Sequence, residues 1–125
     1  MSKRKNKIVA VDLLEQYRST VAADPQSAAA HTDLGWGYYG RDQWVEAIEA
    51  FKQALQLDDQ RLEALYGLGL ALKANGAKTE AVAALEKTLP LVSALPDPAQ
   101  QQMLKRLIAG HLNIIKTGAW NLPPA

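Results

Sequence analysis

Apolar residues recur along this chain at every third or fourth position, which is the spacing of one face of an α-helix. Within 43–57, for example, Trp44, Ile48 and Phe51 fall on one stripe. Five further segments show the same spacing. We therefore predict an all-α protein with about six helices, at 8–23, 28–40, 43–57, 61–74, from 79 to about 90, and at 98–117. Pro90 would clash with the carbonyl four residues earlier, so the fifth helix should end or kink there.

Proline, glycine and short polar residues separate these segments. Pro25 ends the first helix, because the residue before a proline is disfavoured in the α conformation. Ser27 and Asp97 can accept hydrogen bonds from exposed N–H groups, so we predict them as N-caps of the second and last helices. Asn75-Gly76 after the fourth segment and Gly118 after the last one predict C-terminal helix ends.

The helices belong to a repeating unit of 34 residues. Segments 28–61 and 62–95 align without a gap, and the small and large core positions coincide. The matching pairs are Leu34-Gly35 with Leu68-Gly69, Ala47 with Ala81, and Phe51 with Leu85. A unit of this size cannot bury its apolar face alone and must stack on a neighbour. The period therefore predicts a solenoid, an architecture typical of binding scaffolds rather than catalysts.

Composition and charge narrow the class of protein. Hydrophobic residues make up 48% of the chain and aromatic residues only 6%, which favours helices over strands. The absence of cysteine excludes disulfides, thiolate metal sites and cysteine nucleophiles. The net charge is +1, but residues 1–7 hold four of the 14 basic residues, and we expect a flexible, solubilising tail there. Asp12 and Glu15 interrupt the apolar stretch that follows, which argues against a signal peptide, and no run is long enough to span a membrane.

The repeat resembles the tetratricopeptide repeat (TPR) family. Segment 28–61 carries six of that family's eight signature residues. They are Leu34, Gly35, Tyr38, Ala47, Phe51 and Ala54. Segment 62–95 carries Leu68, Gly69 and Ala81, with leucine at three further places that are usually large and apolar. The resemblance implies a short right-handed superhelix of antiparallel helix pairs.

The resemblance also implies a domain organisation. We expect a single TPR-like domain at 8–118, with a basic tail at 1–7 and a second tail at 119–125. Its parts are a half-repeat at 8–27, repeats at 28–61 and 62–95, and a C-terminal capping helix at 98–117. Small residues such as Gly35 and Ala47 then allow the two helices of a pair to approach closely. Tyr38 and Phe51 fill the space between pairs.

In this family the first helix of each pair lines a concave groove. The groove positions of this sequence combine aromatic, apolar and charged side chains. The predicted peptide-binding residues are Thr32, Trp36, Tyr39, Glu63, Tyr66, Leu70 and Lys73. Trp36 and Tyr39 share one helix face, which suits an apolar or aromatic peptide or a partner helix. Two alternatives remain open: the groove is exposed, or the N-terminal or the capping helix covers it.

Other chemistry finds little support. Some relatives bind the C-terminal carboxylate of heat-shock chaperones with cationic and amide side chains on these helices. In this sequence the corresponding places hold Thr32, Trp36, Glu63 and Gly67, so we do not expect that mechanism. His31 and His111 stand at packing positions, without a carboxylate at metal-ligand spacing. We predict no catalytic residue, no metal and no cofactor.

The sequence therefore predicts a non-catalytic protein–protein interaction module or adaptor, located in the cytoplasm, with a protein or peptide partner. Nucleic-acid binding and a membrane span are not expected. The alternative is a structural homo-oligomer whose groove is filled by its own or a neighbouring chain. Trp120 and Leu122 in the C-terminal tail are the apolar residues that could do so.

Overall fold

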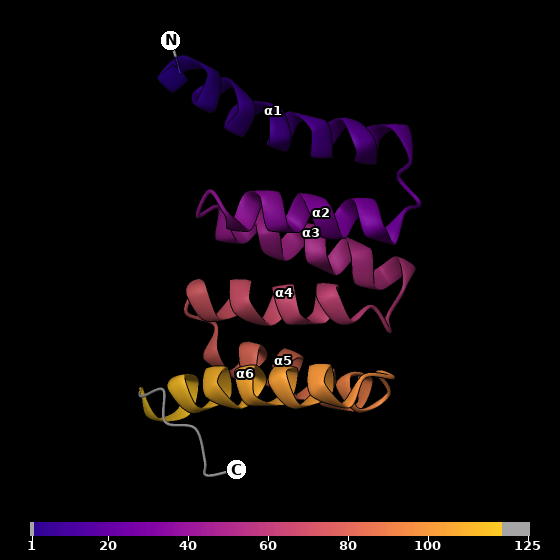
Figure 1. Cartoon of the computed structure of the whole chain (residues 1–125), viewed down its shortest axis with the longest axis vertical. Coiled ribbons are helices and arrows are strands. Elements are labelled where there is room, and N and C mark those ends of the chain that lie inside the picture. The colour runs from indigo at the N-terminus through magenta and orange to yellow at the C-terminus, as the bar shows by residue number, and fades with distance from the viewer. Residues whose placement is uncertain (1, 119–125) are drawn as a thin grey trace.

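The computed structural model describes residues 2–118, with side chains described from residue 13 onward, and these residues form six helices and no strand. The helices are α1 (Ser2–Ala23), α2 (Ala28–Tyr39), α3 (Trp44–Leu57), α4 (Leu62–Ala74), α5 (Lys78–Ser93) and α6 (Pro98–Thr117). They follow one another along the long axis of the molecule, from α1 at one end to α5 and α6 at the other (Figure 1).

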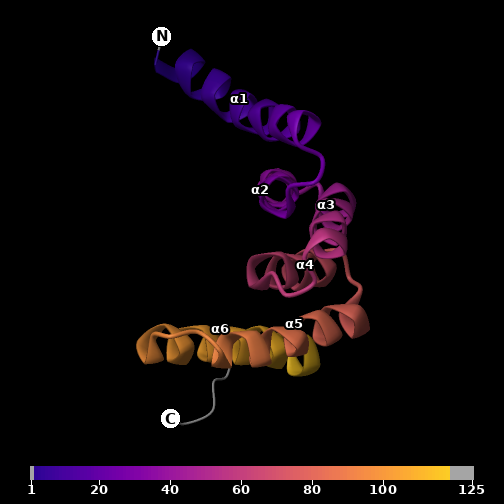
Figure 2. The ribbon, with the colours of Figure 1, turned by 90° about the vertical axis from the view of Figure 1, so that its right-hand side faces the viewer.

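The central helices form two antiparallel pairs, α2 with α3 and α4 with α5, and α3 also packs on α4. Viewed from the side, α2 and α4 lie on one side of the molecule, and α3 and the start of α5 lie on the other (Figure 2). At the two ends of the stack α1 packs on α2, and α6 packs on α5. This is the all-α solenoid of helix pairs that the period of the sequence predicts.

Local sequence signals set most helix ends. The Ser27 hydroxyl accepts a hydrogen bond from the Ala30 N–H at 3.1 Å, and the Asp97 carboxylate accepts one from the Ala99 N–H at 3.0 Å. Gly76 and Gly118 adopt left-handed backbone angles, with φ of 84° and 78°. The predicted caps and stops are therefore confirmed at these positions.

Two helix ends differ from the simple pattern. α1 begins at Ser2 rather than at Ile8, so the segment expected to be a flexible tail has helical backbone. Lysine and arginine are good helix formers, which allows a helix to extend through a basic segment. α5 passes through Pro90 and ends at Ser93. Because Pro90 lies in the last turn, little helix follows the hydrogen bond that it cannot donate.

The centre of the core is the ring of Phe51 on α3, whose side chain is fully buried. A Cβ added at Gly35 on α2 would lie 2.6 Å from this ring, and one at Gly67 on α4 would also overlap it. In the same way, a Cβ at Gly69 would lie 2.7 Å from Leu85. The absence of side chains at these glycines therefore allows α2, α3 and α4 to pack at short distance.

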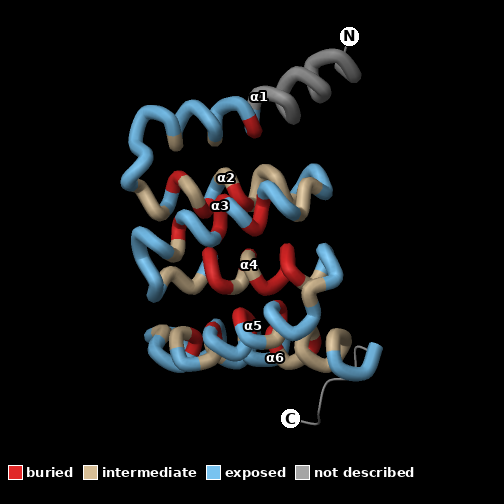
Figure 3. Tube along the Cα trace, turned by 180° about the vertical axis from the view of Figure 1, so that it is seen from behind, coloured by how far each residue is buried: buried red, intermediate tan, exposed pale blue. Residues whose placement is uncertain are grey.

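A second apolar cluster closes the C-terminal end of the stack. Leu85 and Val92 of α5 pack with Ile108 of α6, and all three are buried. The helices between the two ends contain most of the buried residues, whereas the described part of α1 is largely exposed (Figure 3). α6 thus covers an apolar face that the second helix pair would otherwise expose to water.

Candidate functional site

Three of the predicted binding residues form an aromatic cluster on the face made by α2 and α4. The Trp36 ring lies 5.6 Å from the ring of Tyr39 and 6.4 Å from that of Tyr66. It also meets the buried Phe51 ring edge to face at 5.1 Å. Trp36, Tyr39 and Tyr66 are each half-buried, so each residue packs on the protein and remains partly accessible to solvent. We call these three residues the aromatic cluster.

The other predicted residues have different surroundings. The Thr32 side chain is 2% exposed; its hydroxyl donates to the Ala28 carbonyl and accepts a hydrogen bond from Arg61 Nε at 3.0 Å. Leu70 is 9% exposed. Glu63 is exposed near the start of α4. The structure thus brings the three aromatic residues together but does not place Thr32 or Leu70 at an open surface.

His111 of α6 contacts the α4 part of this face. The Lys73 ammonium donates to His111 Nδ1 at 3.1 Å, which leaves the proton of the neutral ring on Nε2. That Nε2–H then donates to the Tyr66 hydroxyl, also at 3.1 Å. The capping helix therefore covers Tyr66 and Lys73, whereas Trp36 and Tyr39 lie farther along the stack.

Burial shifts the ionisation of this contact. Burial, and secondly the Lys73 ammonium, lower the pKa of His111 to about 4. Burial also lowers the pKa of Lys73 and, with a smaller effect from Tyr39, raises the pKa of Tyr66. At neutral pH the histidine is therefore uncharged, which is the form that the two hydrogen bonds require.

A pocket of about 320 Å³ lies between α1 and α2, directly beside the aromatic cluster. Its lining is mainly apolar, with one charged residue. The residues are Leu13, Leu14, Tyr17, Trp36, Gly37, Gly40 and Arg41. We call it the Trp36 pocket. A Cβ added at Gly37 would lie 2.8 Å from the Tyr17 ring, so this glycine sets how closely α1 approaches α2.

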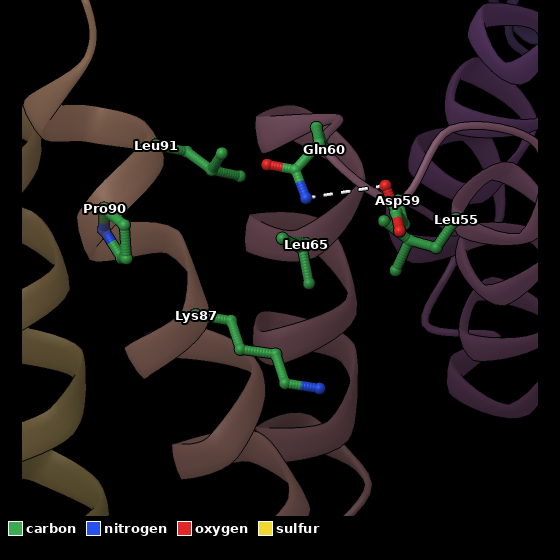
Figure 4. A pocket seen from close by; sticks show the side chains of 7 residues that line it. All are labelled: Leu55, Asp59, Gln60, Leu65, Lys87, Pro90 and Leu91. Atoms are coloured by element: carbon green, nitrogen blue, oxygen red, sulfur yellow. Dashed lines mark hydrogen bonds between the residues drawn. The ribbon is translucent and has the colours of Figure 1, made fainter.

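A second pocket, of about 340 Å³, lies where α5 faces α4 and the connection from α3 (Figure 4). Leu65 and Leu91 supply apolar walls, and Lys87 and Asp59 stand at its sides. The Gln60 amide donates to the Asp59 carboxylate at 3.4 Å. This pocket contains none of the predicted binding residues.

The remaining sequence predictions concern His31, a metal site and a membrane span. The His31 ring is half-buried and its Nε2–H donates to the Pro25 carbonyl at 2.9 Å, the packing role expected for it. Among the described residues, no three histidine, aspartate or glutamate side chains are grouped so that they could hold a metal ion. Within the same part of the chain, no helix has the length and hydropathy that crossing a membrane requires.

Sequence reasoning missed the contribution of α1 to the site. Leu13 and Tyr17 were not among the predicted binding residues, because the half-repeat lacks most of the pattern that identifies groove positions. Arg41 was not among them either, because it follows the last groove position of its repeat. The available signal was the pair Gly37 and Gly40, which leaves one stripe of α2 without side chains.

Comparisons with known proteins agree with this architecture. A family model described as TPR repeat matches residues 37–76. A second, described as the DnaB-helicase binding domain of primase, matches residues 79–114, which contain most of α5 and α6. The BBSome complex member BBS4 of Xenopus tropicalis is 35% identical over 57 residues, which are 46% of this chain and only 11% of that protein.

Two solved structures are similar over most of the chain. The second TPR domain of human RPAP3, solved by NMR in complex with the HSP70 peptide SGPTIEEVD, has a TM-score of 0.67 and 25% identity; the match covers 83% of this chain and 78% of that one. The Yersinia enterocolitica type III secretion translocator chaperone SycD, in an alternative dimer, has a TM-score of 0.78 over 93% of this chain and 86% of that one. At 16% identity, the second similarity concerns the fold alone.

Proposed function

We propose that this chain, which is a tetratricopeptide repeat protein, is a non-catalytic interaction module that binds an apolar or aromatic peptide or helix on the face formed by α2 and α4. The observation that carries the proposal is the aromatic cluster, in which Trp36 and Tyr39 are held by ring contacts and are each only partly buried. Rigid aromatic side chains of this kind dominate binding energy at interfaces, because they bury much area while losing little conformational entropy.

The RPAP3 domain supports a peptide as the class of ligand, since it was solved with one bound. The surface of this chain favours a different peptide chemistry from a carboxylate clamp. Thr32 is buried, Gly67 lies against Phe51, and Glu63 adds a negative charge. We therefore expect recognition to depend on apolar contacts with Trp36 and Tyr39. A cytoplasmic location stays a prediction from the sequence.

The experiment is selection of a phage-displayed random dodecapeptide library on the immobilised full chain. We expect enrichment of peptides rich in aromatic or aliphatic residues, and a loss of roughly tenfold or more in affinity for them in Trp36→Ala, from the removal of one buried aromatic contact. The matched control is Leu91→Ala, which shortens a half-buried side chain in the pocket of Figure 4. Circular dichroism verifies that both variants remain helical.

Two results would contradict the proposal. One is the absence of any enriched peptide over an unrelated helical protein. The other is a set of enriched peptides whose binding is lost in Leu91→Ala and kept in Trp36→Ala.

A second candidate function is a structural homo-oligomer whose groove is filled by its own or a neighbouring chain. The similarity to SycD, which was solved as a dimer, is the observation that favours it. The C-terminal tail with Trp120 and Leu122 lies outside the described residues. Sedimentation equilibrium over a range of concentrations, on the full chain and on a chain ending at Gly118, tests this candidate. An oligomer that disappears on truncation supports it, and a monomer in both samples removes it.

A further inference from the structure

The Trp36 pocket has apolar walls and a charged mouth. Leu14 is buried behind it, while Leu13, Tyr17 and Trp36 present apolar surface around the opening. Arg41, two residues after the end of α2, is exposed, and its side chain makes no hydrogen bond or ion pair with another residue in the described part of the chain. A volume of about 320 Å³ is at the lower end of the range for ligand pockets and provides room for a large side chain.

Gly40 keeps the mouth of this pocket open. It has an ordinary helical φ of −63°, so its conformation does not require glycine. A Cβ added there would meet only two carbonyl oxygens of its own helix, at 3.5 and 3.8 Å, which is normal van der Waals contact. A larger side chain at this position would therefore project into open space at the pocket without disturbing the packing beneath it.

The charges near the pocket favour an anionic group at one side. Asp42 lies toward Tyr39, where burial and, secondly, the Asp42 carboxylate raise the pKa of the phenol. Asp42 does not line the pocket, whereas Arg41 does. Lys73 of α4 donates to His111 and does not line the pocket either, so Arg41 is the cation among the lining residues. A carboxylate of a ligand in the pocket could therefore bind the Arg41 guanidinium, whose planar geometry allows two parallel hydrogen bonds to one carboxylate.

We propose that the Trp36 pocket receives a large apolar side chain from a segment of a partner protein, and that Arg41 pairs with the side-chain carboxylate of an Asp or Glu next to that anchor. This inference rests on the proposed function and adds the chemistry of its ligand. It requires an internal acidic residue and no free C-terminal carboxylate.

The chain's own C-terminal tail fits the pocket less well. Residues 119–125 contain Trp120 and Leu122 but no acidic residue to pair with Arg41. We therefore expect this tail to bind the pocket more weakly than a segment with an acidic residue beside its apolar anchor.

The test compares library selections on four proteins: the full wild-type chain, Arg41→Glu, Gly40→Leu and the control Lys52→Glu. The peptides are fused to the phage coat through their C-terminal ends, so none carries a free C-terminal carboxylate. Lys52→Glu makes the same change in net charge as Arg41→Glu, on an exposed part of α3 that lines neither pocket. Thermal unfolding verifies that each variant is folded.

We expect peptides selected on the wild type and on Lys52→Glu to contain Asp or Glu adjacent to an aromatic or leucine residue. Selection on Arg41→Glu should lose this acidic preference or replace it with Lys and Arg. For a selected peptide, changing its Asp and Glu to Asn and Gln should weaken binding to the wild type roughly two- to fivefold, as for an exposed ion pair, and leave binding to Arg41→Glu unaffected or improved. Gly40→Leu should weaken binding at least about tenfold by occupying the space of the apolar anchor.

The possible failures separate this inference from the proposed function. If the selected peptides are apolar without a preference for Asp or Glu, and their binding is lost in Trp36→Ala, then Arg41 has no role in recognition but the proposed function stands. Unchanged affinity in Gly40→Leu overturns the pocket as the anchor site. A synthetic peptide of residues 119–125 that binds more tightly than any selected peptide overturns the acidic ligand in favour of a second copy. The absence of any enriched peptide removes both proposals.

Discussion

The ring of Phe51 touches positions on three successive helices, because Gly35 on α2 and Gly67 on α4 both lie against it. Gly35 belongs to the signature of the repeat and was interpreted as a close-approach position. Gly67 does not, and its role follows only from the stacking of the second repeat on the first. The chain therefore contains two kinds of close-approach glycine: Gly35 lies between the two helices of one pair, and Gly67 lies between neighbouring pairs.

Gly67→Ala is expected to destabilise the protein. The new methyl group would overlap the Phe51 ring, and overpacking of a core typically costs about 1–3 kcal/mol. The added Cβ would lie less than 3.0 Å from the ring, so we expect this cost to exceed the gain of about 1 kcal/mol in helix propensity. Urea unfolding followed by circular dichroism measures the change. Gly40→Ala is the matched control, since its methyl group has room, and equal stability of the two variants would contradict the expectation.

At the scale of the elements, α6 makes two different contacts with the repeats. Its apolar side buries Ile108 against Leu85 and Val92, and its polar side places His111 between Tyr66 and Lys73. The first contact completes the core and the second covers part of the α2–α4 face. The sequence predicts the helix and its capping role, but the hydrogen bonds that His111 makes with Tyr66 and Lys73 depend on how α6 is placed beside the repeats.

This contact predicts a dependence of stability on pH. The ordinary pKa of histidine is 6.5, and in the folded chain the pKa of His111 is about 4. Between these values the unfolded chain binds a proton that the folded chain excludes, so stability falls as the pH falls from 6.5 towards 4 and is unaffected by His111 above 6.5. We expect a loss of about 1 kcal/mol between pH 7 and pH 5, after discounting for the solvent that reaches the half-buried ring.

Urea unfolding of the wild type and of His111→Gln at both pH values measures this effect. The variant should be less stable at pH 7, where it lacks the aromatic contact, and should lose less stability on acidification. A wild type and a variant that lose the same amount between pH 7 and pH 5 would exclude His111 as the cause.

The whole molecule is a short stack that needs both of its end helices. Two repeats are few for a stable array, since each unit depends on its neighbours for burial. α6 supplies the neighbour on one end and α1 on the other. The stability of the array is therefore shared, and a change at one end should affect all of it.

Ile108→Ala tests this coupling. Ile108 is 1% exposed, so its truncation should cost about 2–5 kcal/mol and lower the unfolding midpoint of the entire chain. Leu107→Ala, one residue earlier and 36% exposed, should cost much less. Tryptophan fluorescence and far-ultraviolet circular dichroism should shift together in Ile108→Ala. A separate early transition in one signal would show that α6 unfolds independently of the repeats.

Part of the candidate site was predictable from sequence. Trp36, Tyr39 and Tyr66 stand at fixed places in the repeat, so the family pattern placed them on one face, and the structure brings their rings together. Thr32 stands at an equivalent place but is enclosed, because Arg61, the residue directly before α4, donates a hydrogen bond to its hydroxyl. The repeat pattern gives the position of a residue on its own helix. It does not give which long side chain from another part of the chain will cover that residue.

By itself the sequence determined the helices, their order and most of their ends. These depend on local effects: helical spacing of apolar residues, capping by Ser27 and Asp97, and the backbone freedom of Gly76 and Gly118. Only the tertiary structure decided how closely α1 approaches α2 and which side chains of α6 reach α4. The Trp36 pocket and the contacts of His111 result from those two placements. Both depend on side-chain packing between residues far apart in the chain, which no local spacing encodes.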